Sequence, residues 1–437
     1  MSRSSVSGSI AEFPGVEHGF LTESARGRAW ARNLLLTKLE SLPIGRLRWQ
    51  EGDETLVLGG RGSGPDVGVR IHDPRVYPKI LFGGAVGAAE AYMAGLWTTD
   101  DLTETLRLFL RNRQVLTHLD SGFGRMARPV RQALHWLRAN SRAGSRRNIA
   151  AHYDLSNELF ELFLDPWMMY SSAIFESDDQ DLDAAAVAKM DRLCRKLELS
   201  PGDHLLEIGT GWGGFAVYAA ETYGCRVTTT TLSQEQLDLA RRRVRRHGLE
   251  DRVELLLSDY RDLEGQYDKL VSIEMVEAVG HAHLGEYLRV CSERLRPGGL
   301  FALQGITIAD RLFEPYRHSV DFIQRYIFPG SALISVGSFT EALRRSSDLQ
   351  LVHLEDIGPH YARTLREWRR RFFANLPAVK DLGFSDRFVR MWEYYLCYCE
   401  AGFLERTIGN LQVVAAKPQN RSRPILGRLE PRAEDLA

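Results

Sequence analysis

The sequence predicts an α/β protein in which a doubly wound, Rossmann-like sheet carries a helical insertion and follows a smaller N-terminal α/β domain. Strand-like and helix-like segments alternate from about residue 200, which is typical of a mostly parallel sheet. A glycine-rich turn separates the first of these strands from the first helix. The length of 437 residues is sufficient for two domains.

The composition is that of an ordinary soluble globular protein, with 44% apolar and 26% charged residues. The five cysteines are too scattered for a disulfide framework and form no CxxC pair, so we expect a cytoplasmic protein without a metal site. The N-terminus lacks the apolar segment of a signal peptide. Residues 80–97 are interrupted by Glu90, which argues against a membrane span.

Residues 1–125 form the predicted N-terminal domain. The segments 46–52, 54–60 and 67–73 resemble short strands separated by glycine turns. We expect residues 88–97 and 101–112 to be helical, with Asp101 or Thr103 as the N-cap of the second helix.

A basic segment follows this domain. From Arg107 to Arg147 the sequence contains ten arginines and a single acid, Asp120. Such blocks bind anionic surfaces, either lipid headgroups or phosphodiester backbones, but they also occur as solvated linkers. We interpret residues 126–147 as a basic linker. A second basic run, 241–248, indicates only the exposed face of a helix.

The larger domain is predicted over residues 148–418, followed by a polar tail over 419–437. Its strands are expected at 204–209, 225–232, 252–259, 267–273, 300–307, 349–357 and 410–418. Helices are expected at 214–224, at 233–248 and within 283–299, and the second of these would begin at Ser233 and stop at Gly248. A mainly helical insertion separates the last two strands.

The glycine-rich turn indicates which cofactor the sheet binds. Its acid-x-Gly-x-Gly-x-Gly pattern consists of Glu207, Gly209, Gly211 and Gly213. A dinucleotide site would need an acid near the end of the second strand, where this sequence has threonines, and the lysine of a phosphate-binding P-loop is absent. With Asp259 closing the third strand, the pattern resembles the S-adenosylmethionine site of a class I methyltransferase.

The segment after the fourth strand bears on the methyl acceptor. Methyltransferases that act on the amino groups of DNA or RNA bases carry an Asn/Asp-Pro-Pro-aromatic motif there. This sequence has "SIEMVEAVG", without prolines. We therefore expect no nucleic-acid substrate.

Several motifs occur in the order found in cyclopropane fatty acid synthases. They are "NIAAHYDLSNELFELFLDPWMMYSSAIFE", "LLEIGTGWGG", "TTLSQEQ", "SIEMVEAVG", "YIFPGSALISV" and "GPHYARTLREW". The N-terminal third, with "IHDPRVYPKILFGGAVGAAEAYMAGLW", resembles the accessory domain of the phospholipid-acting bacterial enzymes. The resemblance implies a lipid-binding role for residues 1–125, unsaturated phospholipid acyl chains as substrate, a peripheral position at the inner face of the membrane and a homodimer.

The resemblance also assigns roles to individual residues. It implies contacts with S-adenosylmethionine by the glycine turn with Glu207 and by Tyr170, Ser171, Trp212, Thr231 and Gln236, with Asp259 and Tyr260 near the adenine. It further implies that Glu277, Ile306 and Tyr361 surround a bound bicarbonate that acts as general base.

Two positions depart from the family pattern, and both belong to the implied anion site. Ser172 stands where most cyclopropane synthases have cysteine, and Gln304 stands where they have histidine. An amide can donate a hydrogen bond to an anion but cannot take a proton as histidine does, so bicarbonate binding is altered or another base replaces it. The sequence looks closer to the branch that makes methylene or methyl-branched fatty acids, in which a separate reductase would complete the product. A cyclopropane synthase and a non-catalytic lipid-binding protein that retains the cofactor are the alternatives.

Two apolar segments allow more than one interpretation. "PWMMYSSAIFE", residues 166–176, is either a buried edge strand or a cofactor-contacting segment. The aromatic stripe within residues 387–407 belongs either to the core or to an acyl-chain channel, and the two roles can occupy different faces of one helix. Its members are Phe388, Met391, Trp392, Tyr395, Tyr398 and Phe403.

Overall fold

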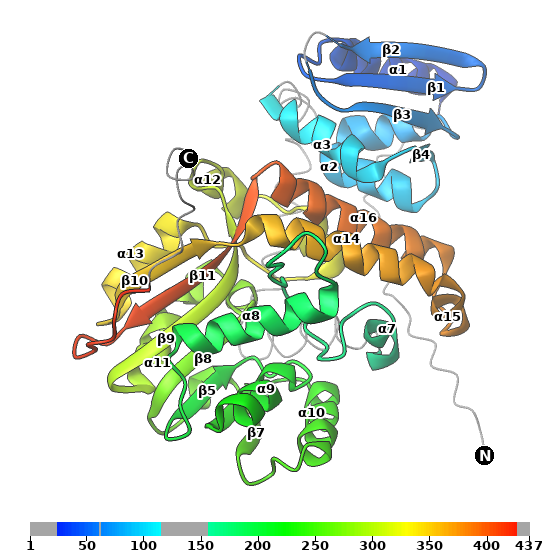
Figure 1. The fold of residues 1–437 in the computed structure, drawn as a ribbon. Coiled ribbons are helices and arrows are strands. Elements are labelled where there is room, and N and C mark those ends of the chain that lie inside the picture. The colour runs from blue at the N-terminus through cyan, green and yellow to red at the C-terminus, as the bar shows by residue number, and fades with distance from the viewer. Residues whose placement is uncertain (1–23, 61–62, 115–155, 426–437) are drawn as a thin grey trace, which may run out of the picture.

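The computed structural model describes residues 24–60, 63–114 and 156–425, which form two sheets with their helices (Figure 1). The proposed domain boundary at residue 125 and the basic linker at 126–147 lie outside the described residues, as does the end of the polar tail from 426 onward. None of the helices in the described ranges is long and apolar enough to span a membrane.

The N-terminal unit consists of a four-stranded sheet and three helices. The strand order is β2-β1-β3-β4, and only the β1–β3 pair is parallel. The elements are α1 (Ala25–Glu40), β1 (Arg46–Glu51), β2 (Glu54–Gly59), β3 (Asp66–Ile71), α2 (Val76–Met93), β4 (Trp97–Thr99) and α3 (Leu102–Arg111). Asp101 caps α3, as one of the two sequence alternatives predicted. The helix predicted to reach Trp97 was wrong at its end, because Gly95 turns the chain at φ 73° and Trp97 begins β4.

The larger unit contains a seven-stranded sheet in the order β10-β11-β9-β8-β5-β6-β7. The strands are β5 (His204–Ile208), β6 (Arg226–Thr231), β7 (Val253–Leu257), β8 (Tyr267–Ile273), β9 (Leu295–Ile308), β10 (Gln350–Asp356) and β11 (Ile408–Ala416). Strands β5 to β9 are parallel, whereas β11 is antiparallel to both β9 and β10. The predicted fold class is confirmed.

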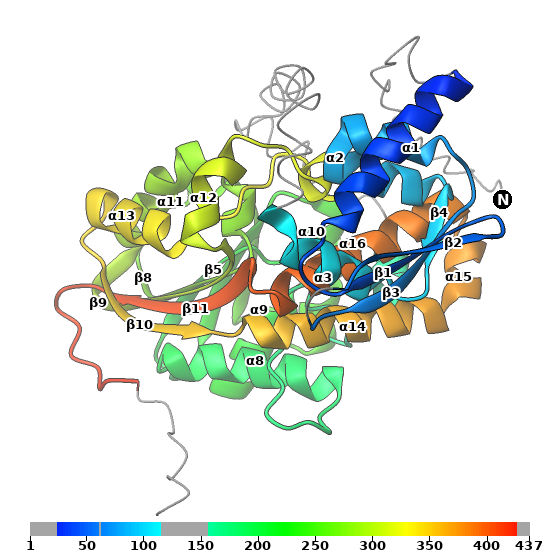
Figure 2. The ribbon, with the colours of Figure 1, turned by 90° about the horizontal axis from the view of Figure 1, so that it is seen from above.

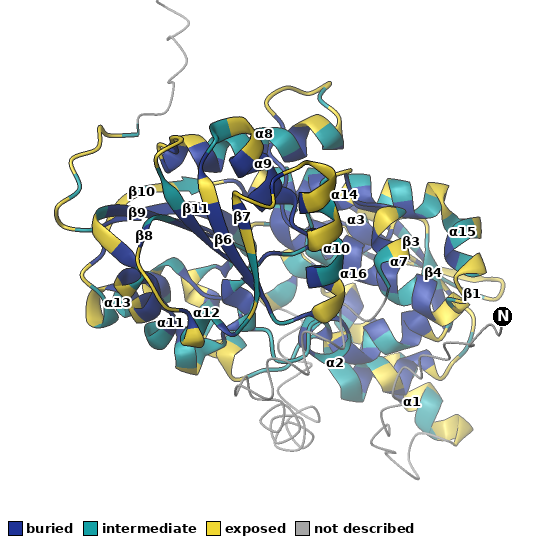
Figure 3. Cartoon of the chain, turned by 90° about the horizontal axis from the view of Figure 1, so that it is seen from below, coloured by how far each residue is buried: buried dark blue, intermediate teal, exposed yellow. Residues whose placement is uncertain are grey.

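Helices cover both faces of this sheet, so its central strands are mostly buried, whereas the edge strands β7 and β10 are partly exposed (Figure 3). One core cluster joins the sheet to α8 (Leu182–Lys196) and α9 (Gly214–Tyr223), beside which α10 (Gln234–Arg246) lies. The other joins it to α11 (Leu284–Glu293) and α13 (Val336–Ser346). Helix α10 begins after Ser233, whose side chain accepts from the Gln236 N–H, and is followed by Gly248, as predicted. Shorter elements are α7 (Asn157–Glu161), α12 (Asp310–Arg317), a π-helical turn at Ile323–Ile327 and 3-10 turns at Tyr260–Asp262, Val276–Ala278 and His281–His283.

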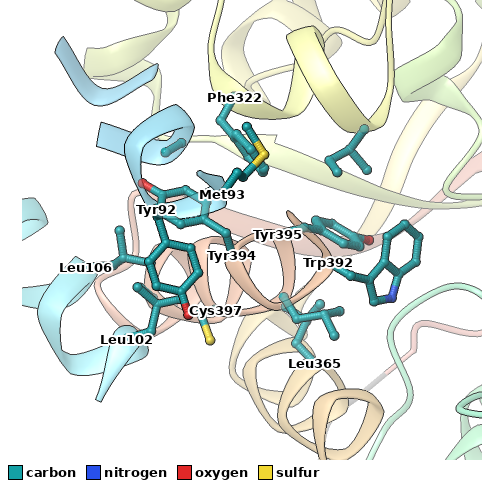
Figure 4. Packing of buried hydrophobic residues seen from close by; sticks show 14 of the residues in the cluster. Tyr92, Met93, Leu102, Leu106, Phe322, Leu365, Trp392, Tyr394, Tyr395 and Cys397 are labelled. Atoms are coloured by element: carbon teal, nitrogen blue, oxygen red, sulfur yellow. The ribbon is translucent and has the colours of Figure 1, made fainter. Parts of the chain in front are cut away.

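The helical insertion between β10 and β11 connects the two units. It comprises α14 (Gly358–Ala374), α15 (Leu376–Asp381) and α16 (Asp386–Leu404), and α16 packs against α2, α3 and α14. Seen from above, the N-terminal unit therefore lies over α14 and α16, beside the large sheet (Figure 2). Tyr92 and Leu106 from the N-terminal unit meet Phe322 and Tyr394 from the larger unit in one buried cluster (Figure 4). The two units share a single hydrophobic core.

Buried polar contacts reinforce this interface. The carboxylate of Glu400, only 1% exposed, accepts a hydrogen bond from Thr103 at 3.1 Å and pairs with Arg366 at 2.9 Å and Arg369 at 3.3 Å. The Tyr92 hydroxyl donates to Glu393 at 2.7 Å. Because the Thr103 and Tyr92 hydrogen bonds cross the interface, separating the units would expose apolar surface and remove these donors from two carboxylates.

Candidate active site

A cavity of about 1020 Å³ lies between the two units and reaches the carboxyl ends of the central strands. Its N-terminal wall is apolar and includes Leu35, Trp49, Val69, Ile71 and Phe82. Its other walls come from the ends of β5, β6, β8 and β9, from α12 and the segment that follows it, and from α16. In open α/β sheets ligands bind at the carboxyl ends of the strands, so the cavity occupies the expected position.

The glycine turn forms the cofactor end of the cavity. Gly209 and Gly211 line it with φ angles of 106° and 50°, a region that favours glycine. A Cβ on Gly211 would meet no atom within 4 Å, so the backbone there borders open space. This exposed backbone before the N-terminus of α9 is the cradle that a cofactor with an adenosyl group needs.

Most of the predicted cofactor residues line the cavity together. They are Tyr170, Ser171, Glu207, Gly209, Gly211, Trp212, Thr231, Gln236 and Tyr260. Two predicted residues do not belong to the lining. Gly213 packs against Ala240 of α10, where an added Cβ would lie 3.0 Å from the Ala240 Cβ. The Asp259 carboxylate pairs with Arg261 at 2.7 Å and caps the following 3-10 turn.

Residues 166–176 do not form the edge strand that we considered from the sequence, because turn contacts prevent an extended backbone. The Asp165 carboxylate accepts from the N–H groups of Trp167 and Met169 at 2.8 and 3.1 Å, and Met168 has a φ of 57°. The resulting turn brings Tyr170 and Ser171 to the cavity. The Tyr170 hydroxyl lies 3.0 Å from that of Tyr395.

A buried lysine lies behind these residues. Lys189 on α8 is 0% exposed, and its ammonium donates to the Ser171 hydroxyl at 2.8 Å. Burial lowers its pKa to about 8, although the charges of Glu274, Asp165 and Glu207 oppose that shift. Burial also raises the pKa of Asp165 to about 6 and that of Glu207 to about 8. The lysine thus supplies the positive charge for a group of buried carboxyls around the cofactor end.

The predicted anion site converges on Glu274, the residue directly after β8. Its Oε1 accepts from the Ser172 N–H at 3.0 Å, from Gln304 Nε2 at 2.9 Å and from Asn410 Nδ2 at 2.5 Å. Its Oε2 accepts from the Tyr361 hydroxyl at 2.7 Å. Glu274 and Tyr361 line the cavity, whereas the other three donors are absent from its lining.

Glu277 lies one turn further along and also lines the cavity. Its Oε1 accepts from the Ile306 N–H at 2.5 Å, while Oε2 is buried and has no hydrogen-bond partner among the described residues. Burial, followed by the charge of Glu274, raises the pKa of Glu277 to about 8. The site therefore holds two neighbouring carboxyls, and at neutral pH the second one is largely protonated.

Comparison with known proteins agrees with this arrangement. A sequence model of the family described as mycolic acid cyclopropane synthetase matches residues 140–413. The chain belongs to this cyclopropane synthase family. It is 39% identical over 399 residues to the tuberculostearic acid methyltransferase UfaA1 of Mycobacterium tuberculosis. The aligned region covers 87% of this chain and 89% of that protein.

Two further relatives show how far the similarity extends. The cyclopropane-fatty-acyl-phospholipid synthase of Escherichia coli K12 is 37% identical over 365 residues, covering 82% of this chain and 89% of that protein. The structure of the mycolic acid cyclopropane synthase CmaA1 complexed with SAH and CTAB is 31% identical, with a TM-score of 0.59. It covers 62% of this chain and 98% of that one. This member of the family is accordingly an S-adenosylmethionine-dependent methyltransferase.

A series of hydrogen-bonded polar side chains orients Gln304 in this methyltransferase. Lys196 donates to the Gln412 Oε1 at 2.8 Å, and Gln412 Nε2 donates to the Gln304 Oε1 at 2.9 Å. The Gln304 oxygen is thereby turned away from Glu274, and its Nε2 donates to Glu274 and to the Ser172 carbonyl. Gln304 therefore acts as a hydrogen-bond donor at the anion site, which is the role its amide allows.

Glu355 holds the outer end of this series, and replacing it by glutamine is expected to lower the free energy of unfolding at neutral pH by about 1–2 kcal/mol. Burial raises its pKa, but hydrogen bonds from Arg192 and Lys196 outweigh this and hold the pKa at about 2. Since the folded pKa lies below the ordinary 4.5, this stability is present above about pH 4.5 and is lost as pH falls toward 2. Urea unfolding should show a smaller difference between wild type and variant in acid than at neutral pH. An undiminished difference would contradict the ion-pair explanation.

The aromatic stripe of α16 has one face toward the cavity and another in the hydrophobic core. Tyr395, Tyr398 and Phe403 line the cavity together with Tyr394. Phe388 and Trp392 are buried in the core, with their rings stacked at 5.4 Å. The stripe is therefore divided between the core and the wall of the cavity, and its role in an acyl-chain channel stays a prediction.

Three site residues were missed from the sequence: Lys189, Asp165 and Glu274. Lys189 shares a helix face with Ala185, Ala186 and Leu193. A charged residue on an otherwise apolar helix face could have identified it as a buried lysine. Glu274 lies in the same segment, "SIEMVEAVG", as the predicted residue Glu277. Its position at the carboxyl end of a central strand could have identified it. Within the described residues, no group of histidine, cysteine and carboxylate side chains could hold a metal ion.

Proposed function

We propose that this methyltransferase transfers the methyl group of S-adenosylmethionine to the cis double bond of an unsaturated phospholipid acyl chain and yields a methylene-branched chain. One observation carries the proposal. A single cavity joins the glycine turn, the carboxyl pair and an apolar wall that extends into the N-terminal unit. A polar cofactor and a long apolar chain can therefore meet there beside a base.

The residues at the cofactor end suit S-adenosylmethionine. The glycine turn borders open space, and Glu207, Thr231 and Gln236 offer polar groups beside it. Tyr170, Ser171 and Trp212 line the same cavity. When bound, the cofactor supplies an electrophilic methyl group on a positively charged sulfur.

The apolar part of the cavity suits a carbocation on the acyl chain. Methyl addition to a double bond leaves a positive charge on carbon, and water would trap that cation as an alcohol. Aromatic rings of Tyr361, Tyr395 and Phe403 line the cavity and present electron-rich faces. Each such contact stabilises a desolvated cation by about 0.5–2 kcal/mol.

The N-terminal unit fits the role of an accessory lipid-binding domain. Its helices and strands contribute Leu39, Val69, Ile80 and Leu106 to the cavity, and these side chains are apolar. An acyl chain can therefore extend from the carboxyl pair between the two units. Residues 1–125 and the catalytic part, 148–418, would thus hold different parts of one substrate.

The arginine-rich segment suits docking on anionic lipid headgroups at the inner face of the cytoplasmic membrane, with about 1 kcal/mol for each basic residue near the surface. Binding to anionic vesicles, followed by co-sedimentation, should weaken as the salt concentration rises. Affinity that does not respond to salt would count against this role. Homodimerisation and reduction of the product by a separate reductase are further parts of the proposal.

The cyclopropane product is the nearer alternative, since the Escherichia coli relative is a cyclopropane-fatty-acyl-phospholipid synthase. Greater identity to the tuberculostearic acid methyltransferase favours the methyl-branched route. The third alternative, a lipid-binding protein without turnover, is disfavoured by the paired carboxyls and Tyr361 at the cavity.

Incubation with S-adenosylmethionine and vesicles of oleoyl phospholipid tests the proposal. Fatty acid methyl esters from the reaction would be analysed by mass spectrometry and proton NMR. We expect a gain of one carbon and vinylidene proton signals. Cyclopropane signals would transfer the assignment to the first alternative, and absence of methyl incorporation would favour the non-catalytic one.

A further inference from the structure

The site contains its own carboxylate where the family pattern implies a bicarbonate ion. The resemblance assigns Tyr361 to the surroundings of that ion, and it places Ser172 and Gln304 in the same anion site. In this structure the Ser172 N–H, the Gln304 amide and the Tyr361 hydroxyl all donate to the Glu274 carboxylate. A bicarbonate ion does not fit here, because the groups that would bind it already have a partner.

The donors around Glu274 indicate an ionised carboxylate. The Ser172 N–H and the NH₂ groups of Gln304 and Asn410 are donors, and all three contact Oε1. The orientation of the Gln304 amide is set from outside the site, since Gln412 donates to its oxygen. A protonated Oε1 would have to break one of these contacts, so this oxygen remains an acceptor.

The backbone of Glu274 suggests that this placement serves function. Its φ of 50° lies in the left-handed region, which non-glycine residues seldom adopt. Its N–H donates to the Gln304 carbonyl at 2.7 Å, which holds the backbone in place. Such strain concentrates at active sites, where the surrounding structure maintains it.

We infer that Glu274 is the general base of the reaction and makes bicarbonate unnecessary. This inference rests on the proposed function. The double-bond electron pair forms the new bond to the methyl carbon, and the S–CH₃ pair returns to sulfur. After a hydride shift places the positive charge on the carbon that bears the new methyl, a methyl C–H bond breaks. Its electron pair forms the exocyclic double bond and its proton passes to Glu274 Oε2.

Oε2 is the oxygen of Glu274 that can accept the proton. It has a single hydrogen bond, from the Tyr361 hydroxyl, whereas Oε1 has three donors. Glu277 lies beside the same cavity, and its burial favours the neutral form. The three donors on Glu274 Oε1, by contrast, favour an ionised carboxylate there.

Three variants test the inference with methyl transfer measured in bicarbonate-free and bicarbonate-supplemented buffer. Glu274→Gln keeps the shape but removes the base, and its kcat should fall by about 100-fold or more in both buffers. Glu274→Gly suits the left-handed backbone and opens a carboxylate-sized space. Added bicarbonate should therefore raise the methyl-transfer activity of this variant at least about tenfold. Glu264→Gln alters an exposed glutamate away from the cavity lining and should match wild type.

Cofactor binding and thermal unfolding are measured for each variant. They distinguish a variant that has lost only the base from one that no longer folds. Wild-type activity should not depend on bicarbonate. Dependence of the wild type on bicarbonate, or near-normal turnover by a folded Glu274→Gln, would overturn the inference while the proposed function stands. Failure of the wild type to transfer any methyl group would overturn the proposed function and the inference with it.

Discussion

Replacing Gly214 by alanine is expected to weaken S-adenosylmethionine binding by about 100-fold and to lower the free energy of unfolding by about 2–3 kcal/mol. Gly214 is the first residue of α9, and an added Cβ would lie 2.3 Å from the Trp167 carbonyl oxygen. That oxygen is backbone and cannot rotate away. The turn that carries Tyr170 and Ser171 would have to move, and both residues would leave the cofactor end of the cavity.

Gly202→Ala is the matched control, because a Cβ at Gly202 meets no atom within 4 Å. Calorimetric titration with S-adenosylmethionine and thermal unfolding would measure both effects. The control should bind and unfold like wild type. If Gly214→Ala binds the cofactor normally, the contact between α9 and residues 166–170 does not position the site as argued.

Replacing Lys189 by methionine is expected to lower the free energy of unfolding by about 3 kcal/mol. The lysine is fully buried, and its positive charge favours the ionised forms of Asp165 and Glu207. Methionine fills similar volume but removes that charge from the surroundings of Asp165 and leaves the Ser171 hydroxyl without its donor. Cofactor affinity should fall together with stability.

Arg195→Met on the same helix provides the comparison. Its side chain is 76% exposed and pairs with Asp191, so the loss should be within about 0.5 kcal/mol. Chemical unfolding of both variants, with and without S-adenosylmethionine, measures the difference. Equal effects of the two substitutions would show that Lys189 contributes no more than a surface cation.

Local sequence signals predicted the architecture of the larger unit well. The alternation of strands and helices, the Ser233 cap and the turn at Gly209 and Gly211 depend on residues close together in the chain. Periodicity and turn chemistry act over that range. For the same reason the glycine pattern indicated the cofactor, and most of the residues assigned to it do line one cavity.

Sequence patterns failed where a single side-chain contact decides the local conformation. Residues 166–176 have strand-like composition. Hydrogen bonds from the Trp167 and Met169 N–H groups to the Asp165 carboxylate nevertheless fold the beginning of this segment into a turn. Asp259 closes the third strand as expected, but Arg261 engages its carboxylate. In each case a side-chain contact outweighed the preference that the segment would show by itself.

The amino-acid sequence by itself determined the fold class, the cofactor loop and membership of the cyclopropane synthase family, since these depend on local pattern and on motif order. Only the tertiary structure revealed that the N-terminal unit shares a core and a cavity with the catalytic part. It alone also placed Glu274 among donors from residues 172, 304, 361 and 410. Those donors come from four separate segments, and the environment of a carboxylate is set by what surrounds it in space.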